Sequence, residues 1–211
     1  MTQQPTARRG ARPLALLACA LLALCTASCA VLYGGSSGMN PQHAEALRQA
    51  DQMESIEAFQ RDIEPALIAA RNELLTSENI RTYSGGDHIS ATPYADQYLY
   101  SMMSRHYWFE ERDVNKVRST INSHLEPLGF TMMEKEEHTA DGDTHANFYW
   151  TNARYGATVS VLVGQVMNSS YFYYTAPLRS DGSADDPKKL FDTPGRIPDW
   201  FDPNLPPAGQ G

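Results

Sequence analysis

In residues 146–177, ANFYWTNARYGATVSVLVGQVMNSSYFYYTAP, three runs of aromatic and β-branched side chains are separated by two short polar breaks. The middle run alternates and places three valines on one face: Val159, Val161 and Val163. This two-residue period is typical of a β-strand. The breaks at Arg154-Tyr155-Gly156 and Asn168-Ser169 are short enough for tight turns, so the stretch predicts three antiparallel strands.

Two more strands are expected on the N-terminal side of this stretch. Residues 130–137 are a strand candidate, and Ala140-Asp141-Gly142-Asp143 predicts a hairpin turn because Asp-Gly supplies the positive φ that such turns need. Residues 95–110, ADQYLYSMMSRHYWFE, predict a long aromatic strand with a break near Ser104. Residues 76–93 carry Ser, Gly and Pro, and we expect them to form a loop.

Apolar residues recur at three- and four-residue steps over residues 44–74, which predicts an amphipathic helix that begins at Asn40-Pro41. Pro65 lies inside this pattern and should kink or split the helix near Asp62–Glu64. A further helix is expected over residues 112–126.

Asp113 is positioned to cap the start of this further helix, and Pro127 with Gly129 should stop it. The order of elements predicts an α+β domain over residues 41–178. We expect a mainly antiparallel sheet of about four to five strands with helices packed on one face, preceded by the N-terminal amphipathic helix.

Residues 179–211 contain six prolines and four glycines with few apolar side chains. We expect this tail to be extended or disordered. Trp200-Phe201 could dock on the same domain or on a partner, and we favour the same domain.

The first 28 residues have the parts of a secretory signal. Arg8, Arg9 and Arg12 precede an apolar run over residues 14–24, and the segment has no acidic residue. The run is too short to span the hydrocarbon core of a bilayer by itself. Residues 1–28 are therefore expected to be a targeting segment.

Leu24-Cys25-Thr26-Ala27-Ser28-Cys29 resembles a bacterial lipoprotein lipobox, with Thr26 where that family usually has Leu. The resemblance implies that the Cys29 thiol takes a diacylglyceryl group before cleavage. Residues 29–40, with several Gly and Ser, would then be a flexible tether. Three alternatives remain open: ordinary cleavage near Ala27 or Ala30, an uncleaved signal anchor over residues 14–33, and an organellar transit peptide.

The charge balance argues against a nucleic-acid partner. The chain has 17 Lys and Arg against 25 Asp and Glu, a formal net charge of −8. Removing residues 1–28 leaves 14 basic residues against 25 acidic ones, or −11. Such a chain has no general attraction to phosphate backbones or to an anionic membrane surface. Lipid, rather than charge, must hold it at a membrane.

No motif for catalysis or cofactor binding stands out, so we expect no cofactor, no metal and no catalytic residue. The sequence lacks an HExxH motif, paired CxxC motifs and a GxSxG elbow. An acidic cluster surrounds the expected hairpin turn: Glu134, Glu136, Glu137, His138, Asp141, Asp143 and His145. We interpret it as a solvated turn, with a weak divalent-cation site as the alternative. His106 is more typical of a sheet histidine than of a pocket histidine.

Aromatic side chains are the one positive indication of a binding surface. Fifteen of the 21 lie between Tyr94 and Tyr174. Consecutive residues of a strand point to opposite faces, so half of each aromatic run cannot face the helices. These rings either pack under a second layer or a partner, or stack on a sugar or peptide. The candidate stacking residues are Tyr98, Tyr100, Trp108, Trp150 and Tyr173.

With its lipobox and polar tether, followed by Leu128-Gly129-Phe130 and the run from Tyr155 to Val161, the chain is similar to small actinobacterial lipoproteins such as the LppA-like proteins. These families are largely uncharacterised, so the resemblance implies a cell-envelope location and no activity. We expect a lipid-anchored, non-enzymatic binding or interaction module at the extracytoplasmic face of the cell membrane. Its partners would be the membrane and an envelope protein or a cell-wall glycan or peptide. The alternatives are a cell-wall-modifying enzyme and a structural accessory subunit of an envelope complex.

Overall fold

The chain divides into two units, residues 1–38 and residues 39–211. The computed structural model describes residues 40–138, 144–165 and 168–205, all of which belong to the second unit. The lipobox, most of the tether and the turn expected at residues 140–143 lie outside the described residues. No helix in the described part is long and apolar enough to cross a membrane.

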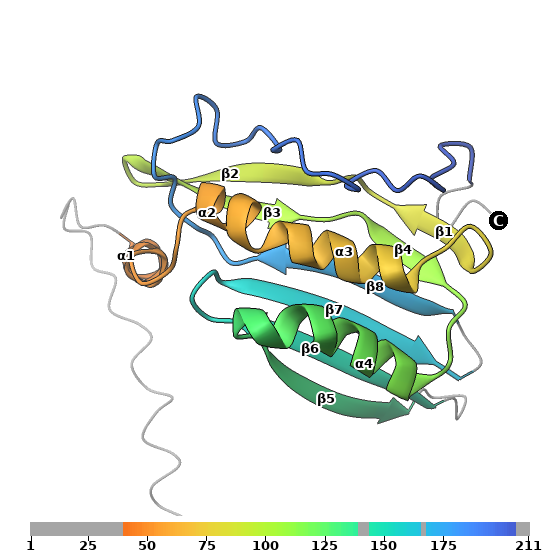
Figure 1. Cartoon of the computed structure of the whole chain (residues 1–211). Helices are drawn as coiled ribbons and strands as arrows, with labels where there is room; N and C mark the ends of the chain where they lie inside the picture. Colours follow the sequence, from red (N-terminus) through yellow and green to blue (C-terminus); the bar gives the residue numbers. More distant parts are fainter. Residues whose placement is uncertain (1–39, 139–143, 166–167, 206–211) are drawn as a thin grey trace, which may run out of the picture. The chain divides into compact units, whose positions relative to one another are not determined.

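An antiparallel sheet of eight strands forms the body of the second unit (Figure 1). The strands are β1 (Ile80–Ser84), β2 (His88–Tyr94), β3 (Gln97–Met103), β4 (His106–Phe109), β5 (Thr131–His138), β6 (Thr144–Asn152), β7 (Ala157–Gly164) and β8 (Ser169–Thr175). The main path runs β1-β4-β8-β7-β6-β5, while β3 pairs with both β2 and β8. Because β3 and β4 both pair with β8, they are two halves of one interrupted strand, and β2 and β1 flank them.

The expectation of four to five strands is wrong, and one region accounts for most of the difference. Residues 76–93, expected to form a loop, contain β1 and all of β2 except its last residue, Tyr94. The predicted break near Ser104 is confirmed, since β3 ends at Met103 and β4 begins at His106. The fold is α+β overall, with a larger sheet than predicted.

Four α-helices and one short 3₁₀ turn accompany the sheet: α1 (Pro41–Ala50), α2 (Ile56–Asp62), α3 (Glu64–Leu74), α4 (Val114–Leu125) and η1 (Glu126–Leu128). The predicted split at Pro65 is confirmed, because a single residue, Ile63, separates α2 from α3. A second break follows Ala50, where the Ser55 side chain accepts a hydrogen bond from the Ala58 N–H and starts α2. The Asp113 carboxylate caps α4 as predicted, and Gly129 ends η1 at a φ of 82°.

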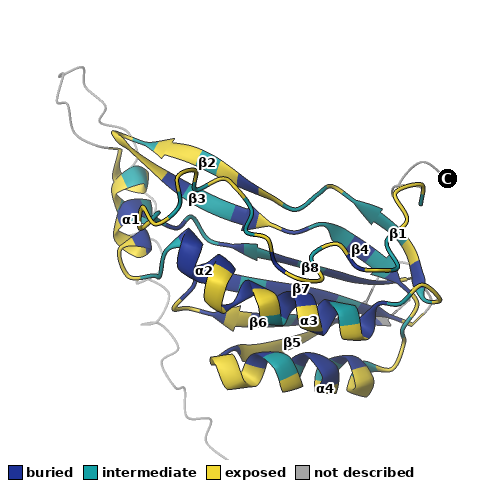
Figure 2. Cartoon of the chain, turned by 45° about the horizontal axis from the view of Figure 1, so that its top comes forward, coloured by how far each residue is buried: buried dark blue, intermediate teal, exposed yellow. Residues whose placement is uncertain are grey.

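Helices α2, α3 and α4 pack on one face of the sheet (Figure 1). The core lies between these layers and includes Phe59, Leu67, Ile121, Phe148 and Val161, each with none of its surface exposed. Figure 2 shows buried residues on the sheet and on the helix sides that face it, with exposed residues along the outer sides of the helices. A smaller cluster of Leu47, Ala50 and Leu99 holds α1 at the end of β3.

Residues 179–205 contain no helix or strand and pack beside α2 and α3. They cover polar side chains on the helices that are themselves almost fully buried: Glu57, Gln60, Glu64 and Arg71. Gln60 accepts a hydrogen bond from the Phe191 N–H, and Arg71 donates to the carbonyl of Gly195 at 2.6 Å. Trp200 packs against the core, with its ring 6.0 Å from that of Tyr107.

Candidate functional site

The face of the sheet opposite α2, α3 and α4 is the candidate site, and we call it the open face. Antiparallel partners share a face, so the strand register identifies its residues. One cross-strand row is Met133, Tyr149, Ser160 and Phe172. The second is Lys135, Asn147, Leu162, Ser170 and Trp108. The third is Thr131, Thr151, Thr158, Tyr174 and Met103.

Four rings on β4 and β8 form a continuous ladder across the open face. Trp108 stacks on His106 with ring centroids 3.9 Å apart, and His106 lies 4.6 Å from Phe172. Phe172 in turn stacks on Tyr174 at 5.8 Å. All four are half-buried, so the ladder stabilises the sheet and still presents ring edges to solvent. Trp108 and Tyr174 are its two ends.

The open face differs in charge from the chain as a whole. None of the residues in the three rows is Asp or Glu, and Lys135 is the single basic residue among them. The rows also contain serine, threonine and asparagine side chains. Ser160, Ser170 and Asn147 are almost buried, whereas Thr131 and Thr151 are exposed. The surface therefore offers apolar rings together with neutral hydrogen-bonding groups, on a chain whose net charge is −8.

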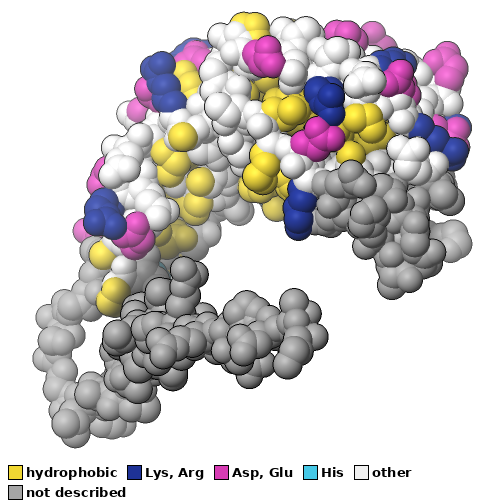
Figure 3. Space-filling model, turned by 90° about the horizontal axis from the view of Figure 1, so that it is seen from below, with side chains coloured by type: hydrophobic (Ala, Val, Ile, Leu, Met, Phe, Trp, Pro, Cys, Tyr) yellow, Lys and Arg dark blue, Asp and Glu magenta, His cyan; other side chains and the backbone are white. Residues whose placement is uncertain are grey.

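The β5 edge of the sheet carries exposed hydrophobic side chains. β5 ends the sheet order, and Met133 on it is 59% exposed. Met132, which pairs with the buried Trp150 and so lies on the helix-covered face, and Leu128 in η1 are also exposed near this edge. Figure 3, seen from the side on which β5 lies, shows hydrophobic side chains exposed among charged ones. Natural sheets protect such edges with charge, and here Glu134 pairs with Arg118 at 2.7 Å.

The five predicted stacking residues do not share one surface in the structure. Trp108 lies on the open face. Tyr98 is 58% exposed near the β2–β3 turn, and Tyr100 is half-buried where its strand meets Leu178. Trp150 and Tyr173 are fully buried and belong to the core, so neither ring can reach a ligand in this conformation.

Sequence reasoning omitted three of the four rings in the ladder: His106, Phe172 and Tyr174. The alternation of Tyr171-Phe172-Tyr173-Tyr174 held the information needed. Tyr173 pairs with Val159, which lies on the core face with the other valines of its strand. The odd-numbered tyrosines therefore face the core, and Phe172 and Tyr174 face away from it.

His106 occupies the middle of the ladder. Its Nε2 is buried and has no hydrogen-bond partner among the described residues, and burial lowers the pKa of the imidazole. The ring is thus held in its neutral form. His124, by contrast, lies on α4, where its Nε2 is 2.7 Å from Glu73 Oε2 at an accessible position. The two histidines occupy separate surroundings.

The described residues show no group of three or more His, Cys, Asp and Glu side chains arranged to hold a metal ion. Of the acidic cluster around the expected hairpin turn, residues 139–143 lie outside the described part of the chain. Glu134 is engaged by Arg118.

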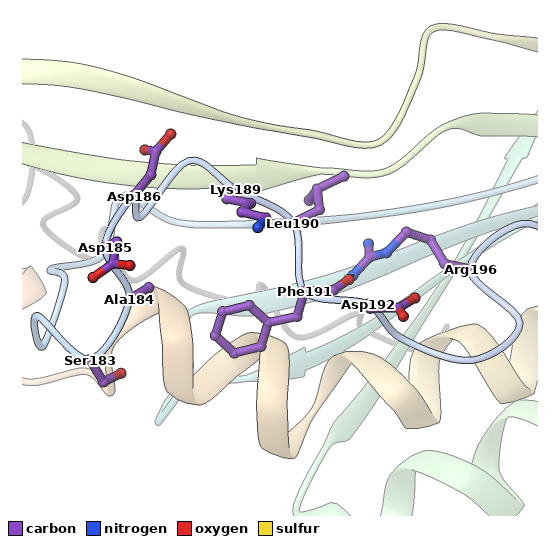
Figure 4. A pocket seen from close by; sticks show the side chains of 9 residues that line it. All are labelled: Ser183, Ala184, Asp185, Asp186, Lys189, Leu190, Phe191, Asp192 and Arg196. Carbon is purple, nitrogen blue, oxygen red and sulfur yellow. The ribbon is translucent and has the colours of Figure 1, made fainter.

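A pocket of about 720 Å³ lies in the C-terminal segment, between β3 and the helices (Figure 4). Its lining includes three carboxylates and two cations, and Arg196 in its wall already binds Glu64 through both guanidinium Nη atoms. In Figure 4 Phe191 points toward the helices and Leu190 toward the strands. The mixed charges indicate no single ligand class, so we consider the open face the stronger candidate.

Comparison with known proteins places the chain in a family. The model of the "domain of unknown function (DUF4853)" matches residues 52–186. The chain belongs to the DUF4853 family. That match covers most of the strands and helices described above and ends within the C-terminal segment, before five of the nine residues that line the pocket.

A crystal structure of a DUF4853 family protein from Actinomyces odontolyticus has a similar fold, with a TM-score of 0.52 and 12% sequence identity. The match covers 70% of this chain and 83% of the other. No curated protein matches. The expectation of an uncharacterised family is confirmed, and these comparisons assign no activity to the DUF4853 fold.

Proposed function

We propose that this DUF4853 protein is a lipid-anchored cell-envelope binding module, attached through Cys29, that binds a neutral cell-wall glycan on its open face. The proposal rests on which side chains make up the three cross-strand rows of that face. The three rows contain no carboxylate, and the four-ring ladder is accompanied by the exposed Thr131 and Thr151 and the half-buried Thr158. Rings give apolar contact, and neutral hydroxyl groups fix orientation by hydrogen bonds.

The size of the surface favours a glycan over a folded protein partner. The second and third rows cross five strands, which is about 19 Å at the usual strand spacing, and the three rows together span about 14 Å along the strands. The area of these three rows alone is well below the roughly 800 Å² per partner of a stable protein–protein interface. An uncharged chain of sugars would also avoid the repulsion that an acidic polymer would meet from a body at −11.

The binding test uses the full chain and isolated cell-wall material in a co-sedimentation assay. Trp108→Ala and Tyr174→Ala remove the two ends of the ladder, and we expect each to weaken binding at least fivefold. Ile197→Ala is the matched control, because Ile197 is 69% exposed but lies on the C-terminal segment. Equal binding by all four proteins would contradict the proposal. If the chain captures an envelope protein and does not bind wall glycan, the ligand of the open face is a protein and the glycan proposal is wrong.

The anchor is tested separately by cell fractionation. Cys29→Ser removes the thiol that would carry the lipid, so we expect the chain to leave the membrane fraction or to accumulate unprocessed. Cys25→Ser is the control, since Cys25 precedes the expected cleavage site. A Cys29→Ser protein that stays in the membrane fraction at its mature size would rule out the lipid anchor.

A further inference from the structure

The described part of the chain begins beside the β2–β3 turn. His43, in the first turn of α1, lies against Tyr94 at the end of β2, with ring centroids 5.2 Å apart. Leu47 and Ala50 of the same helix pack on Leu99 in β3. Asn40, which caps α1, therefore marks the end of the domain from which any N-terminal anchor must extend.

The segment between Cys29 and α1 limits how far that end can lie from a bilayer. Eleven residues, 30–40, separate them. Fully extended they span about 38 Å, but a Gly- and Ser-rich chain of this length has a root-mean-square end-to-end distance of about 17–20 Å. A nine-residue strand such as β6 is itself about 30 Å long. The α1 end of the domain is consequently the end that the tether holds near the membrane.

Tyr98 gives this end an aromatic contact. It follows the β2–β3 turn, whose residue Ala95 has a φ of 57°, and its side chain is 58% exposed. Tyrosine is enriched where protein meets the headgroup region, since one end of the ring is apolar and the hydroxyl stays hydrated.

Three arginines near this end are matched by acidic partners. Arg154, in the β6–β7 turn, holds Glu54 at 2.8 Å, and Arg179 holds Asp51 at 2.5 Å. Arg179 also donates to Gln97 in β3, which ties it to the same hairpin. Arg48 of α1 pairs with Glu45.

These pairs neutralise part of the acidic charge at the α1 end. Asp96 in the turn is acidic, but Arg48 and Arg154 are each about 70% exposed on their side chains. Each guanidinium has further N–H donors that can bind a lipid phosphate while its carboxylate stays paired. An acidic body can approach anionic headgroups where its own carboxylates are already neutralised.

We infer that the α1 end, with Tyr98 at the β2–β3 turn, rests in the headgroup layer of the bilayer. This inference rests on the lipid anchor proposed above. The contact fixes the orientation of the domain. Its strands then point away from the membrane, and the open face is roughly perpendicular to the bilayer instead of facing it.

The test places a fluorescent label at defined positions of the membrane-bound full chain. After processing, Cys29 is the single native cysteine and its thiol is blocked by lipid, so an introduced cysteine takes the label alone. Tyr98→Cys is the test variant. Ile197→Cys is the matched control, because it is 69% exposed and lies just after Arg196, whose carbonyl binds Arg71 in the last turn of α3, away from α1 (Figure 1).

Vesicles carrying lipids with a nitroxide in the headgroup quench labels that lie in the headgroup layer. We expect the label at position 98 to be quenched at least twofold more strongly than the label at position 197. Equal quenching at both positions, with the protein still bound to the vesicles, would overturn the inference and leave the anchor intact. Failure of the processed parent chain to float with the vesicles would overturn the anchor and the orientation together.

Discussion

The carboxylate of Glu64 at the start of α3 and the guanidinium of Arg196 in the C-terminal segment form a buried two-point ion pair. Arg196 Nη1 lies 2.5 Å from Glu64 Oε1, and Nη2 lies 2.8 Å from Oε2. The Tyr173 hydroxyl donates to the same carboxylate at 2.8 Å. Burial raises the pKa of Tyr173 well above its ordinary value, and Glu64 adds to the shift, so the hydroxyl remains a donor. One carboxylate thus links a helix, the sheet and the C-terminal segment.

Removing Arg196 should be among the most destabilising single changes in the chain. Arg196→Ala leaves Glu64, which has none of its surface exposed, without its counter-charge. Breaking a buried pair in this way typically costs about 3–5 kcal/mol. Urea denaturation of the two proteins measures the loss. Arg154→Ala is the control: it removes an exposed pair with Glu54 and should leave the midpoint almost unchanged. Similar midpoints for both variants would mean that the C-terminal segment is not held by this pair.

Gly195→Ala tests the close approach of the C-terminal segment to α3. Gly195 has a φ of +75°, and a Cβ there would lie 2.7 Å from Asn72 Nδ2. Gly182 has the same φ with nothing within 4 Å of the added atom. Both substitutions force alanine into the left-handed region of φ, which costs about 1–2 kcal/mol. The difference in stability between the two variants therefore measures the clash alone. We expect Gly195→Ala to have the lower thermal midpoint by several degrees. Equal midpoints would show that the Asn72 side chain or the segment moves aside without cost, and that the close approach does not hold the segment.

The helices and the core strands could be predicted from the sequence, because the residue patterns that encode them are local. Pro65 split the predicted helix where its missing N–H required, and Asp113 capped α4. The edge of the sheet was missed for a physical reason. Of the seven residues of β2, Ile89 alone is buried, so the strand shows no apolar alternation to distinguish it from a loop.

The role of the C-terminal segment was equally hidden. Glu57, Gln60, Glu64 and Arg71 recur at helical spacing and resemble the solvated face of an amphipathic helix. They are buried because residues more than a hundred positions later cover them, and no local pattern encodes that contact. The open face could be predicted only in part. Alternation fixes which rings share a face, but the register with Val159 was needed to decide which face is covered.

Trp108 and Trp150 should respond differently to truncation, although both were predicted as stacking residues. Trp150 is fully buried and its Nε1 donates to Asn122 at 2.7 Å, so Trp150→Ala should cost about 3–5 kcal/mol. Trp108 is half-buried at the end of the ladder, and Trp108→Ala should cost about 1 kcal/mol from its contact with His106. Chemical denaturation of the two variants checks the difference. A larger loss for Trp108→Ala would place that ring in a core rather than on a binding surface.

The neutral state of His106 predicts a pH-dependent stability. Burial lowers the pKa of its imidazole below the ordinary value of 6.5, so the unfolded chain binds a proton more readily than the folded one. The stabilising contribution of the neutral ring is therefore complete above pH 6.5 and is lost as the pH falls through the folded-state pKa. His106→Phe keeps a ring in the ladder but cannot take up a proton. We expect the free energy of unfolding of His106→Phe, relative to that of the wild type, to rise as the pH falls from 7.5 to 5. His88→Phe, at an exposed position of β2, controls for the loss of one histidine. A constant difference between His106→Phe and wild type across that range would mean that His106 is not desolvated within the ladder.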